Sequence, residues 1–152
     1  MHNVNMLSSK QALDDLILET FRLHGALIAA GDALVRDLGL TSARWQVLGA
    51  VAKAGATPSL SAIARTMGLS RQAVRRIVNE MEREGLLATE PHPTNRRLRL
   101  VVLTAAGRSA HVAADERQEP WGQDLASPFS TKELLSALKV LRTLRERLGD
   151  GL

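Results

Sequence analysis

Apolar residues recur at three- and four-residue steps through most of the chain, a pattern typical of amphipathic helices. The first stretch runs from 9 to 38, where Ser8 and Gln11 have the spacing of a capping box and Gly39 can close the far end. Glycine and proline residues separate the later stretches. The pattern predicts helices over 9–38, 42–53, 60–67, 71–84, 105–118 and 131–148.

One region between the helices has a different pattern. Residues 86–90 and 98–103 are short strand candidates, and two prolines and an asparagine mark the loop between them. This hairpin directly follows helix 71–84, which itself follows helix 60–67 and a tight turn at Gly68. The order predicts a mainly α fold, a winged helix-turn-helix domain with a small β-hairpin as its wing.

The helices at both ends of the chain exceed what a small winged domain needs. A first helix of about 30 residues would be about 45 Å long, and Pro120 and Gly122 are expected to interrupt the helix that precedes the last one. The predicted organisation is an N-terminal dimerisation helix (1–38), a winged helix-turn-helix DNA-binding domain (39–107) and C-terminal dimerisation helices (108–152).

The terminal helices carry leucine stripes that are expected to bury each other across the two-fold axis of a homodimer. The alternative, in which these helices fold back on their own chain, stays open at this stage. The predicted dimer-interface residues are Leu13, Leu16, Leu134, Leu138, Leu141, Leu144 and Leu148.

The net charge of +4 is concentrated in one block of the chain. Between Arg65 and Arg99 there are eight arginines and four acidic residues, so the remaining residues are balanced. All eight cations are Arg, whose planar guanidinium makes bidentate contacts with phosphates and guanine edges. A merely solubilising surface would normally mix Lys with Arg and spread both, so the clustering favours a nucleic-acid partner.

One side of the predicted helix 71–84 is suited to reading base pairs. Its apolar residues fall in one arc of a helical wheel, and its polar residues fall in the opposite arc. Early residues of a recognition helix usually meet base edges in the major groove. An ordinary solvated face is the alternative, which the preceding turn and the following wing disfavour. Bases are assigned to Gln72, Arg75 and Arg76, phosphates to Ser70 and Arg71, and weaker contacts to Asn79 and Arg83.

The tip of the predicted wing carries Asn95, Arg96 and Arg97. A positively charged tip beside a major-groove helix can enter the adjacent minor groove, where narrow A/T tracts attract Arg. Neighbouring residues of a hairpin point in opposite directions, so one arginine is expected to face the groove while the other holds the loop or a phosphate. The sequence leaves open which arginine does which, and a solubilising turn is the alternative.

From Leu38 to Gly107 the chain resembles the MarR (multiple antibiotic resistance regulator) family of winged-helix regulators. The order of its motifs is fairly specific, although the helix-turn-helix portion alone would fit many regulators. The segments that carry the resemblance are SAIARTMGLSRQAVRRIV (61–78), MEREGLL (81–87), PTNRR (93–97) and LTAAG (103–107).

The resemblance implies an obligate dimer, built from the first helix and the last two, whose winged domains contact successive major grooves of a pseudo-palindrome. For many members it also implies a small-molecule site between the dimer helices and the DNA-binding lobe. The family's wing usually carries an acidic residue just before the arginines, and here that position is Asn95. The Asp–Arg bond that would orient the wing is therefore expected to be missing.

A small apolar or aromatic effector would need a largely apolar pocket. The sequence offers Phe21, His24, Trp45 and Leu48 as candidate pocket residues, while plain core positions are the alternative for each. His24 could also be a satisfied polar group on a half-buried helix face rather than a ligand-binding or pH-sensing residue.

Several kinds of chemistry lack a signature in the sequence. The chain has no Cys, and no two of its four His residues have the i, i+4 spacing of a helical metal pair. It shows no phosphate-binding Gly loop and no nucleophile motif, so no enzyme, metal or cofactor is predicted. Without a signal-like start or a long apolar run, a cytoplasmic location is expected.

The predicted function is therefore a sequence-specific regulator that binds double-stranded DNA. The favoured interpretation is a homodimeric repressor on a pseudo-palindromic operator, released by a small-molecule effector. The alternative is a winged-helix protein–protein interaction module without DNA binding.

Overall fold

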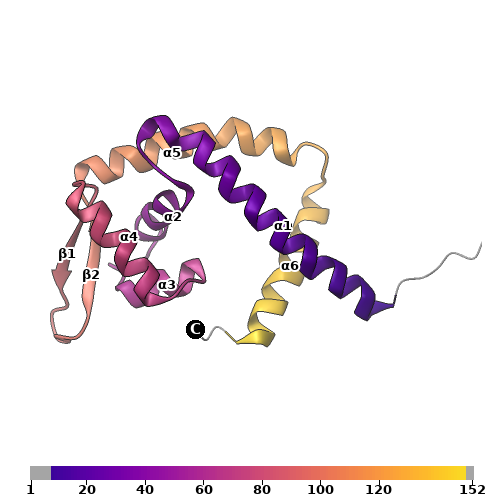
Figure 1. Ribbon diagram of the computed structural model, residues 1–152, viewed down its shortest axis with the longest axis horizontal. Helices are drawn as coiled ribbons and strands as arrows, with labels where there is room; N and C mark the ends of the chain where they lie inside the picture. The colour runs from indigo at the N-terminus through magenta and orange to yellow at the C-terminus, as the bar shows by residue number, and fades with distance from the viewer. Residues whose placement is uncertain (1–7, 150–152) are drawn as a thin grey trace, which may run out of the picture.

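The computed structural model describes residues 8–149, so the start of the chain, where a secretory signal was judged absent, lies outside the described residues. The described chain is helical except for one two-stranded hairpin (Figure 1). Its elements are α1 (Ser9–Val35), the 3₁₀ turn η1 (Arg36–Leu38), α2 (Ser42–Ala52), α3 (Leu60–Met67), α4 (Arg71–Arg83), β1 (Leu87–Pro91), β2 (Arg99–Leu103), α5 (Ala105–Ala126) and α6 (Thr131–Leu148). The predicted winged helix-turn-helix order is confirmed.

A Ser or Thr directly precedes each α-helix as its N-cap. Its hydroxyl accepts a backbone N–H of the first turn, which satisfies one of the free donors there. The expected capping box at Ser8 and Gln11 is present, and a second one joins Ser130 and Glu133 at α6. The caps are Ser8, Thr41, Ser59, Ser70, Thr104 and Ser130.

The predicted break at Pro120 and Gly122 is wrong, because α5 continues through both residues to Ala126. A proline in a helix interior costs about 3 kcal/mol relative to alanine. Contacts on both sides of Pro120 offset this cost. Before it, Arg117 binds the carboxylate of Asp37 and the carbonyl of Leu34, and after it the half-buried Trp121 packs into the wall of a cleft described below.

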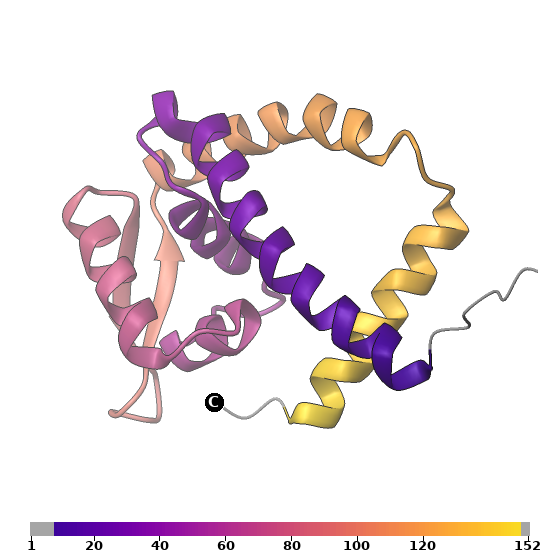
Figure 2. The same cartoon turned by 45° about the vertical axis from the view of Figure 1, so that its right-hand side comes forward.

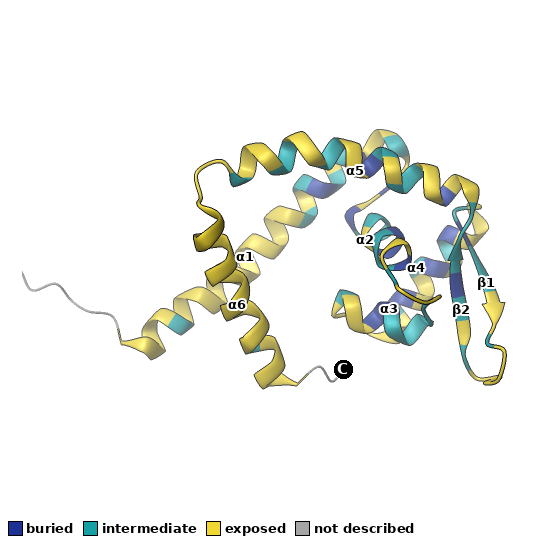
Figure 3. Cartoon of the chain, turned by 180° about the vertical axis from the view of Figure 1, so that it is seen from behind, coloured by how far each residue is buried: buried dark blue, intermediate teal, exposed yellow. Residues whose placement is uncertain are grey.

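The hydrophobic core lies between the end of α1, α2, α3, α4, the hairpin and the first half of α5 (Figure 3). Trp45 and Met67 are half-buried and pack at its margin. The largest fully buried side chains are Val35, Val47, Leu48, Ile63, Val74, Val78, Met81, Leu87 and Val101.

The hairpin is fixed in register and attached to the helices. Its strands pair antiparallel from Leu87 opposite Leu103 to Pro91 opposite Arg99. The backbone N–H of Val101 also donates to the carbonyl of Pro58, 2.9 Å away, which joins β2 to the segment before α3. The wing therefore extends from a base that is continuous with the helix-turn-helix.

The N-terminal part of α1 and the whole of α6 lie away from this core (Figures 1 and 2). Within residues 8–149, no other element packs extensively against α6, and most residues along both helices are exposed. A search of the described helices finds none that is both long and apolar enough to span a membrane.

Candidate nucleic-acid interface

Helix α4 has one buried side and one fully exposed side. Val74, Val78 and Met81 have no exposed surface, and Ala73 and Ile77 are half-buried. Because these residues face the core, the opposite side of the helix faces solvent. It presents Gln72, Arg75, Arg76, Asn79 and Arg83, all of which are exposed.

The turn before α4 sets the direction in which the helix leaves the core. Gly68 adopts a left-handed conformation with φ 65°, which glycine reaches without steric cost. Ser70 then begins α4, and its hydroxyl accepts the N–H of Ala73 at 3.1 Å. Arg71 follows in the first turn and is exposed. The unpaired N–H groups of this turn, together with a cation, form a local environment suited to phosphate.

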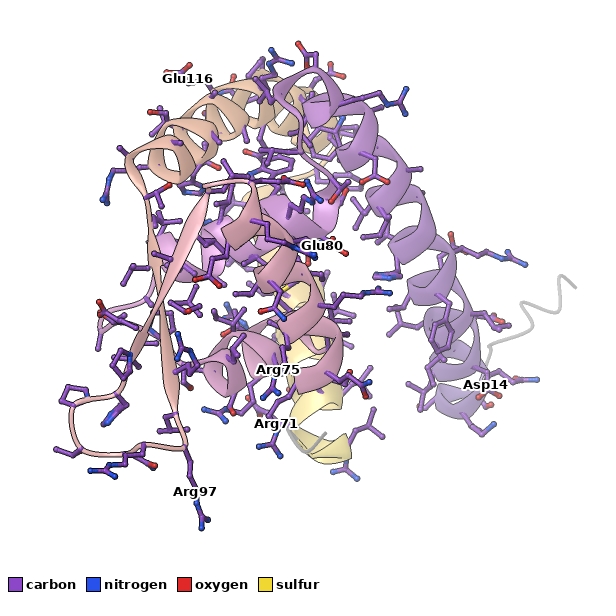
Figure 4. All side chains as sticks on the ribbon, turned by 60° about the vertical axis from the view of Figure 1, so that its left-hand side comes forward. Asp14, Arg71, Arg75, Glu80, Arg97 and Glu116 are labelled. Atoms are coloured by element: carbon purple, nitrogen blue, oxygen red, sulfur yellow. The ribbon has the colours of Figure 1, made fainter. Side chains whose placement is uncertain are left out.

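The wing tip lies at the same end of the molecule as the start of α4. Figure 4 shows Arg71, Arg75 and Arg97 at one end of the molecule, whereas Glu116 on α5 lies at the opposite end. Asn95 and Arg96 are exposed as well. The structure thus brings Arg71 and Arg75 of the helix and Arg97 of the wing to one end of the winged domain, although they are more than 20 positions apart along the chain.

Three of the four acidic residues of this block, Glu80, Glu82 and Glu84, bond to residues other than its exposed arginines. Arg44 of α2 forms ion pairs with Glu80 at 3.5 Å and Glu84 at 2.6 Å, which join α2 to α4. Glu82 accepts the N–H and hydroxyl of Thr89 at 3.2 and 3.0 Å. The exposed face of α4 therefore keeps its positive charge, which favours an anionic partner.

The sequence analysis did not find the role of Arg44. It lies outside the arginine-rich block, 36 and 40 positions from its partners, and only the packing of α2 against α4 brings the three side chains together.

A cleft of about 1020 Å³ lies between α2, α3, α5 and the hairpin. Of the predicted effector-pocket residues, Trp45 lies in its wall, whereas Leu48 is fully buried in the core. Phe21 and His24 are exposed on α1 and do not line this cleft. The sequence analysis missed the other wall residues, which include Lys53, His92, His111 and Trp121.

Polar groups are grouped on one wall of the cleft. The indole N–H of Trp45 donates to Asp115 at 3.4 Å, and Nε2 of His111 lies 3.4 Å from the other oxygen of the same carboxylate. Nδ1 of His111 is buried and has no hydrogen-bond partner among the described residues. The wall therefore combines aromatic surface with a small number of fixed polar groups, as is common in small-molecule sites.

Arg117, in the middle of α5, attaches this helix to α1 through the carbonyl of Leu34 and to η1 through the carboxylate of Asp37. The Arg117 guanidinium donates a hydrogen bond to Asp37 and holds the pKa of that carboxyl below its usual value. Among residues 8–149, no group of three or more His, Asp or Glu side chains could hold a metal ion.

The fold and the exposed basic surface define a winged helix-turn-helix DNA-binding protein. Such proteins place the second helix of the motif in the major groove and set the wing beside it.

Comparison with known proteins places this architecture in a family. The MarR family model matches residues 38–98. The chain is 32% identical over 143 residues to the transcriptional activatory protein BadR of Rhodopseudomonas palustris, covering 90% of this chain and 81% of that protein.

Two solved structures share the fold. CouR from Rhodococcus jostii RHA1 bound to p-coumaroyl-CoA has a TM-score of 0.77 at 22% identity, with coverage of 86% of this chain and 92% of CouR. MosR of Mycobacterium tuberculosis in complex with DNA has a TM-score of 0.74 at 22% identity, with coverage of 88% and 97%.

The chain belongs to the MarR family. It is a DNA-binding transcription regulator, and its family and relatives are regulators rather than enzymes.

Proposed function

We propose that this regulator is a homodimeric repressor that occupies a pseudo-palindromic operator and is released by a small aromatic effector. Its two recognition helices would lie about 34 Å apart, one turn of B-DNA. The observation that carries the proposal is the exposed side of α4, where Gln72, Arg75 and Arg76 face solvent beside the wing while Val74 and Val78 are fully buried.

The roles of individual residues follow from their positions. Gln72, Arg75 and Arg76 would read base edges, and Ser70 and Arg71 would bind phosphates at the start of α4. Asn79 lies one turn further along and would make a weaker contact. Asn95, Arg96 and Arg97 at the wing tip would follow the adjacent minor groove.

The unpartnered terminal helices support the homodimer. Large apolar side chains remain exposed on α1 and α6, including Leu16, Leu138 and Leu141. Leu13 and Leu144 are half-buried, and Leu148 is exposed at the end of α6. A second copy of the chain offers the same surface and would bury all of these stripes across a two-fold axis.

The cleft supports the effector. Its wall contains Trp45 and Trp121, which can stack on a planar molecule, and the cation Lys53. CouR, which has this fold, is bound to p-coumaroyl-CoA in its solved structure. Phe21 and His24 do not line this cleft in the single chain. They stay predicted effector contacts, which a partner subunit would have to bring into a site.

Selection of bound duplexes from a random DNA pool by the purified protein tests the operator. Two similar half-sites with centres about one helical turn apart are the expected result. Affinity for the selected duplex should fall steeply with salt, because phosphate contacts release counterions. A protein that selects no sequence and ignores duplexes at low ionic strength would instead be the winged-helix protein–protein module.

The direction of regulation needs its own measurement, since the relative BadR is named an activatory protein. A reporter gene placed under the selected operator should be expressed more strongly when this regulator is deleted. Lower expression after deletion would make the protein an activator and overturn the repressor proposal.

A further inference from the structure

The loop at the wing tip is short and internally bonded. Beyond the last strand pair, the backbone N–H of His92 donates to the carbonyl of Leu98 at 3.2 Å. The backbone N–H of Leu98 donates to the backbone carbonyl of Asn95 at 3.1 Å. These bonds close the chain into a tight turn that carries Arg96 and Arg97 at its outer side.

The centre of this turn is the imidazole of His92. Its Nδ1 accepts the backbone N–H groups of Thr94 at 3.2 Å and Asn95 at 3.0 Å, and the Thr94 hydroxyl lies 3.4 Å from the same nitrogen. Because Nδ1 accepts these bonds, it carries no hydrogen in this arrangement. The ring is half-buried and forms part of the cleft wall together with Leu98, so it is a fixed support for the loop.

A second side chain extends this arrangement to the arginines. Asn95, which His92 holds through its N–H, accepts the N–H of Arg97 at 3.0 Å on its side-chain oxygen. Asn95 stands where the family usually has an acidic residue that bonds to Arg. Here hydrogen bonds from backbone N–H groups to the side chains of His92 and Asn95 fix the loop instead. The side chains of Arg96 and Arg97 stay exposed, and neither forms an ion pair with another described residue.

We propose that His92 is the positioning residue of the wing: its unprotonated Nδ1 organises the loop before DNA arrives, so that Arg96 and Arg97 meet the duplex without a further ordering cost. This role rests on the proposed contact between the wing and DNA. Ordering a loop in advance raises affinity, because the entropy of ordering is no longer lost on binding. His92 itself does not contact the DNA in this role.

Two neutral substitutions separate this role from the alternatives. His92→Phe keeps a ring of similar shape in the cleft wall but removes the acceptor. His92→Asn offers an amide oxygen near the position of Nδ1 and lacks any group at the position of Nε2. Neither variant differs in charge from the neutral imidazole, so the long-range attraction to DNA is unchanged.

The experiment measures affinity and its salt dependence on a duplex selected with the wild-type protein, for both variants and for Arg96→Ala/Arg97→Ala with and without His92→Phe. His92→Phe should weaken binding about 3- to 30-fold, the range for one or two lost hydrogen bonds, and should lower the salt slope. His92→Asn should restore most of the affinity. In the variant without the two arginines, His92→Phe should have no further effect, because coupled residues are not additive.

Three results would overturn the proposal. Equal weakening by His92→Asn and His92→Phe would mean that Nε2, which both variants lack, contacts the DNA. A full effect of His92→Phe in the absence of both arginines would mean that it does not act through them. No effect of His92→Phe, in a protein that binds the duplex and is weakened by loss of the arginines, would refute the positioning role and leave the proposed function intact. Equal melting temperatures for all variants establish that the fold is retained.

Discussion

Charged and apolar side chains alternate along α4 within single helical turns. Arg75 and Arg76 follow directly on Val74, yet the first two are exposed and Val74 has no exposed surface. The burial of the apolar residues fixes the rotation of the helix, and this rotation determines which polar residues can reach a groove. Residues that never touch DNA therefore set the position of those proposed to read it.

Arg75→Ala should weaken binding to the cognate operator by about 1–3 kcal/mol and relax the base preference at one position of each half-site. The reason is the loss of a bidentate contact with a base edge. Titration of the selected operator and its single-base variants measures both effects. Arg108→Ala, which removes the same charge from the exposed surface of α5, is the matched control and should leave the preference unchanged. An equal loss of affinity on every sequence would make Arg75 a phosphate contact.

The absence of a side chain at Gly107 allows the start of α5 to pack closely against the backbone of Leu86 at the base of the wing. A Cβ atom at this position would lie 2.0 Å from the carbonyl oxygen of Leu86, a backbone atom that also accepts the N–H of Thr104. Gly107→Ala should therefore lower the free energy of unfolding by about 1–3 kcal/mol, as overpacking usually does. Urea denaturation measures the change.

Gly55→Ala provides the control for this substitution, because a Cβ there would meet nothing within 4 Å. It should leave the stability equal or slightly higher. Equal stability of the Gly107→Ala protein and the wild type would contradict the steric argument.

At the scale of the elements, local signals and tertiary contacts differ in what they reveal. The helix starts could be predicted because a Ser or Thr hydroxyl bonds within its own first turn, as at Ser70 and Ser130. The continuation of α5 through Pro120 could not, since it depends on contacts with α1, η1 and the cleft. The predicted ends of β1 and β2 differ from the observed ends by at most one residue, because strand ends follow hydrogen bonding across the hairpin.

The residues of the candidate site also differ in how far the sequence alone predicts them. The exposed residues of α4 follow from helical periodicity, a property of the sequence alone. The bonds of His92 to the wing loop and of Arg44 to α4 depend on the folded loop and on packing between helices. The cleft wall also combines Lys53, which directly follows α2, with Trp121 of α5, and no single periodic pattern contains both residues.

The ion pair between Asp37 and Arg117 should make the junction of η1 and α5 dependent on pH. Because Arg117 lowers the pKa of Asp37 in the folded protein, the pair stabilises the fold at neutral pH, and this contribution is lost as the pH falls through the lowered pKa. Asp37→Asn should therefore lower the melting temperature at neutral pH and low salt, and the difference from the wild type should shrink in strong acid. Thermal melts at several pH values measure it.

Asp15→Asn is the matched control, because it removes the same charge from an exposed position of α1 that forms no ion pair with another described residue. It should not reproduce this pH dependence. A gap between Asp37→Asn and wild type that stays constant from neutral pH to strong acid would contradict the assignment.

In the whole molecule, the surface proposed to meet DNA and the surfaces proposed to join two copies lie on different parts of the chain. The winged domain has its own core, whereas α1 and α6 extend from it with exposed leucines (Figures 2 and 3). Helix α5 runs from the base of the wing toward α6 and so connects the two parts. Displacement of α5 would change the distance between the two winged domains of a dimer.

Leu141→Glu should convert the proposed dimer into a monomer of 16.5 kDa, because it places a charge in the apolar face of α6. Leu141 is 43% exposed in the single chain, so the substitution should leave the fold of the subunit intact. Light scattering after size exclusion measures the mass. DNA affinity should fall at the same time, since one half-site is no longer engaged.

Val112→Glu on α5 is the control, because Val112 is 51% exposed and lies outside the predicted interface. It should keep the mass of the wild type. A wild-type protein that is itself a monomer at micromolar concentration, or a Leu141→Glu protein that stays a dimer, would refute the assigned interface.

The double position of His92, in the cleft wall and at the centre of the wing loop, bears on how such a regulator could be adapted as a biosensor. A substitution there that accommodates a new inducer would also change the background signal in the absence of any inducer, so sensitivity and leakiness would not be tunable separately. Libraries aimed at new inducers are better directed at Lys53 and Trp121, which line the same cleft and form no hydrogen bond with the described residues of the wing loop.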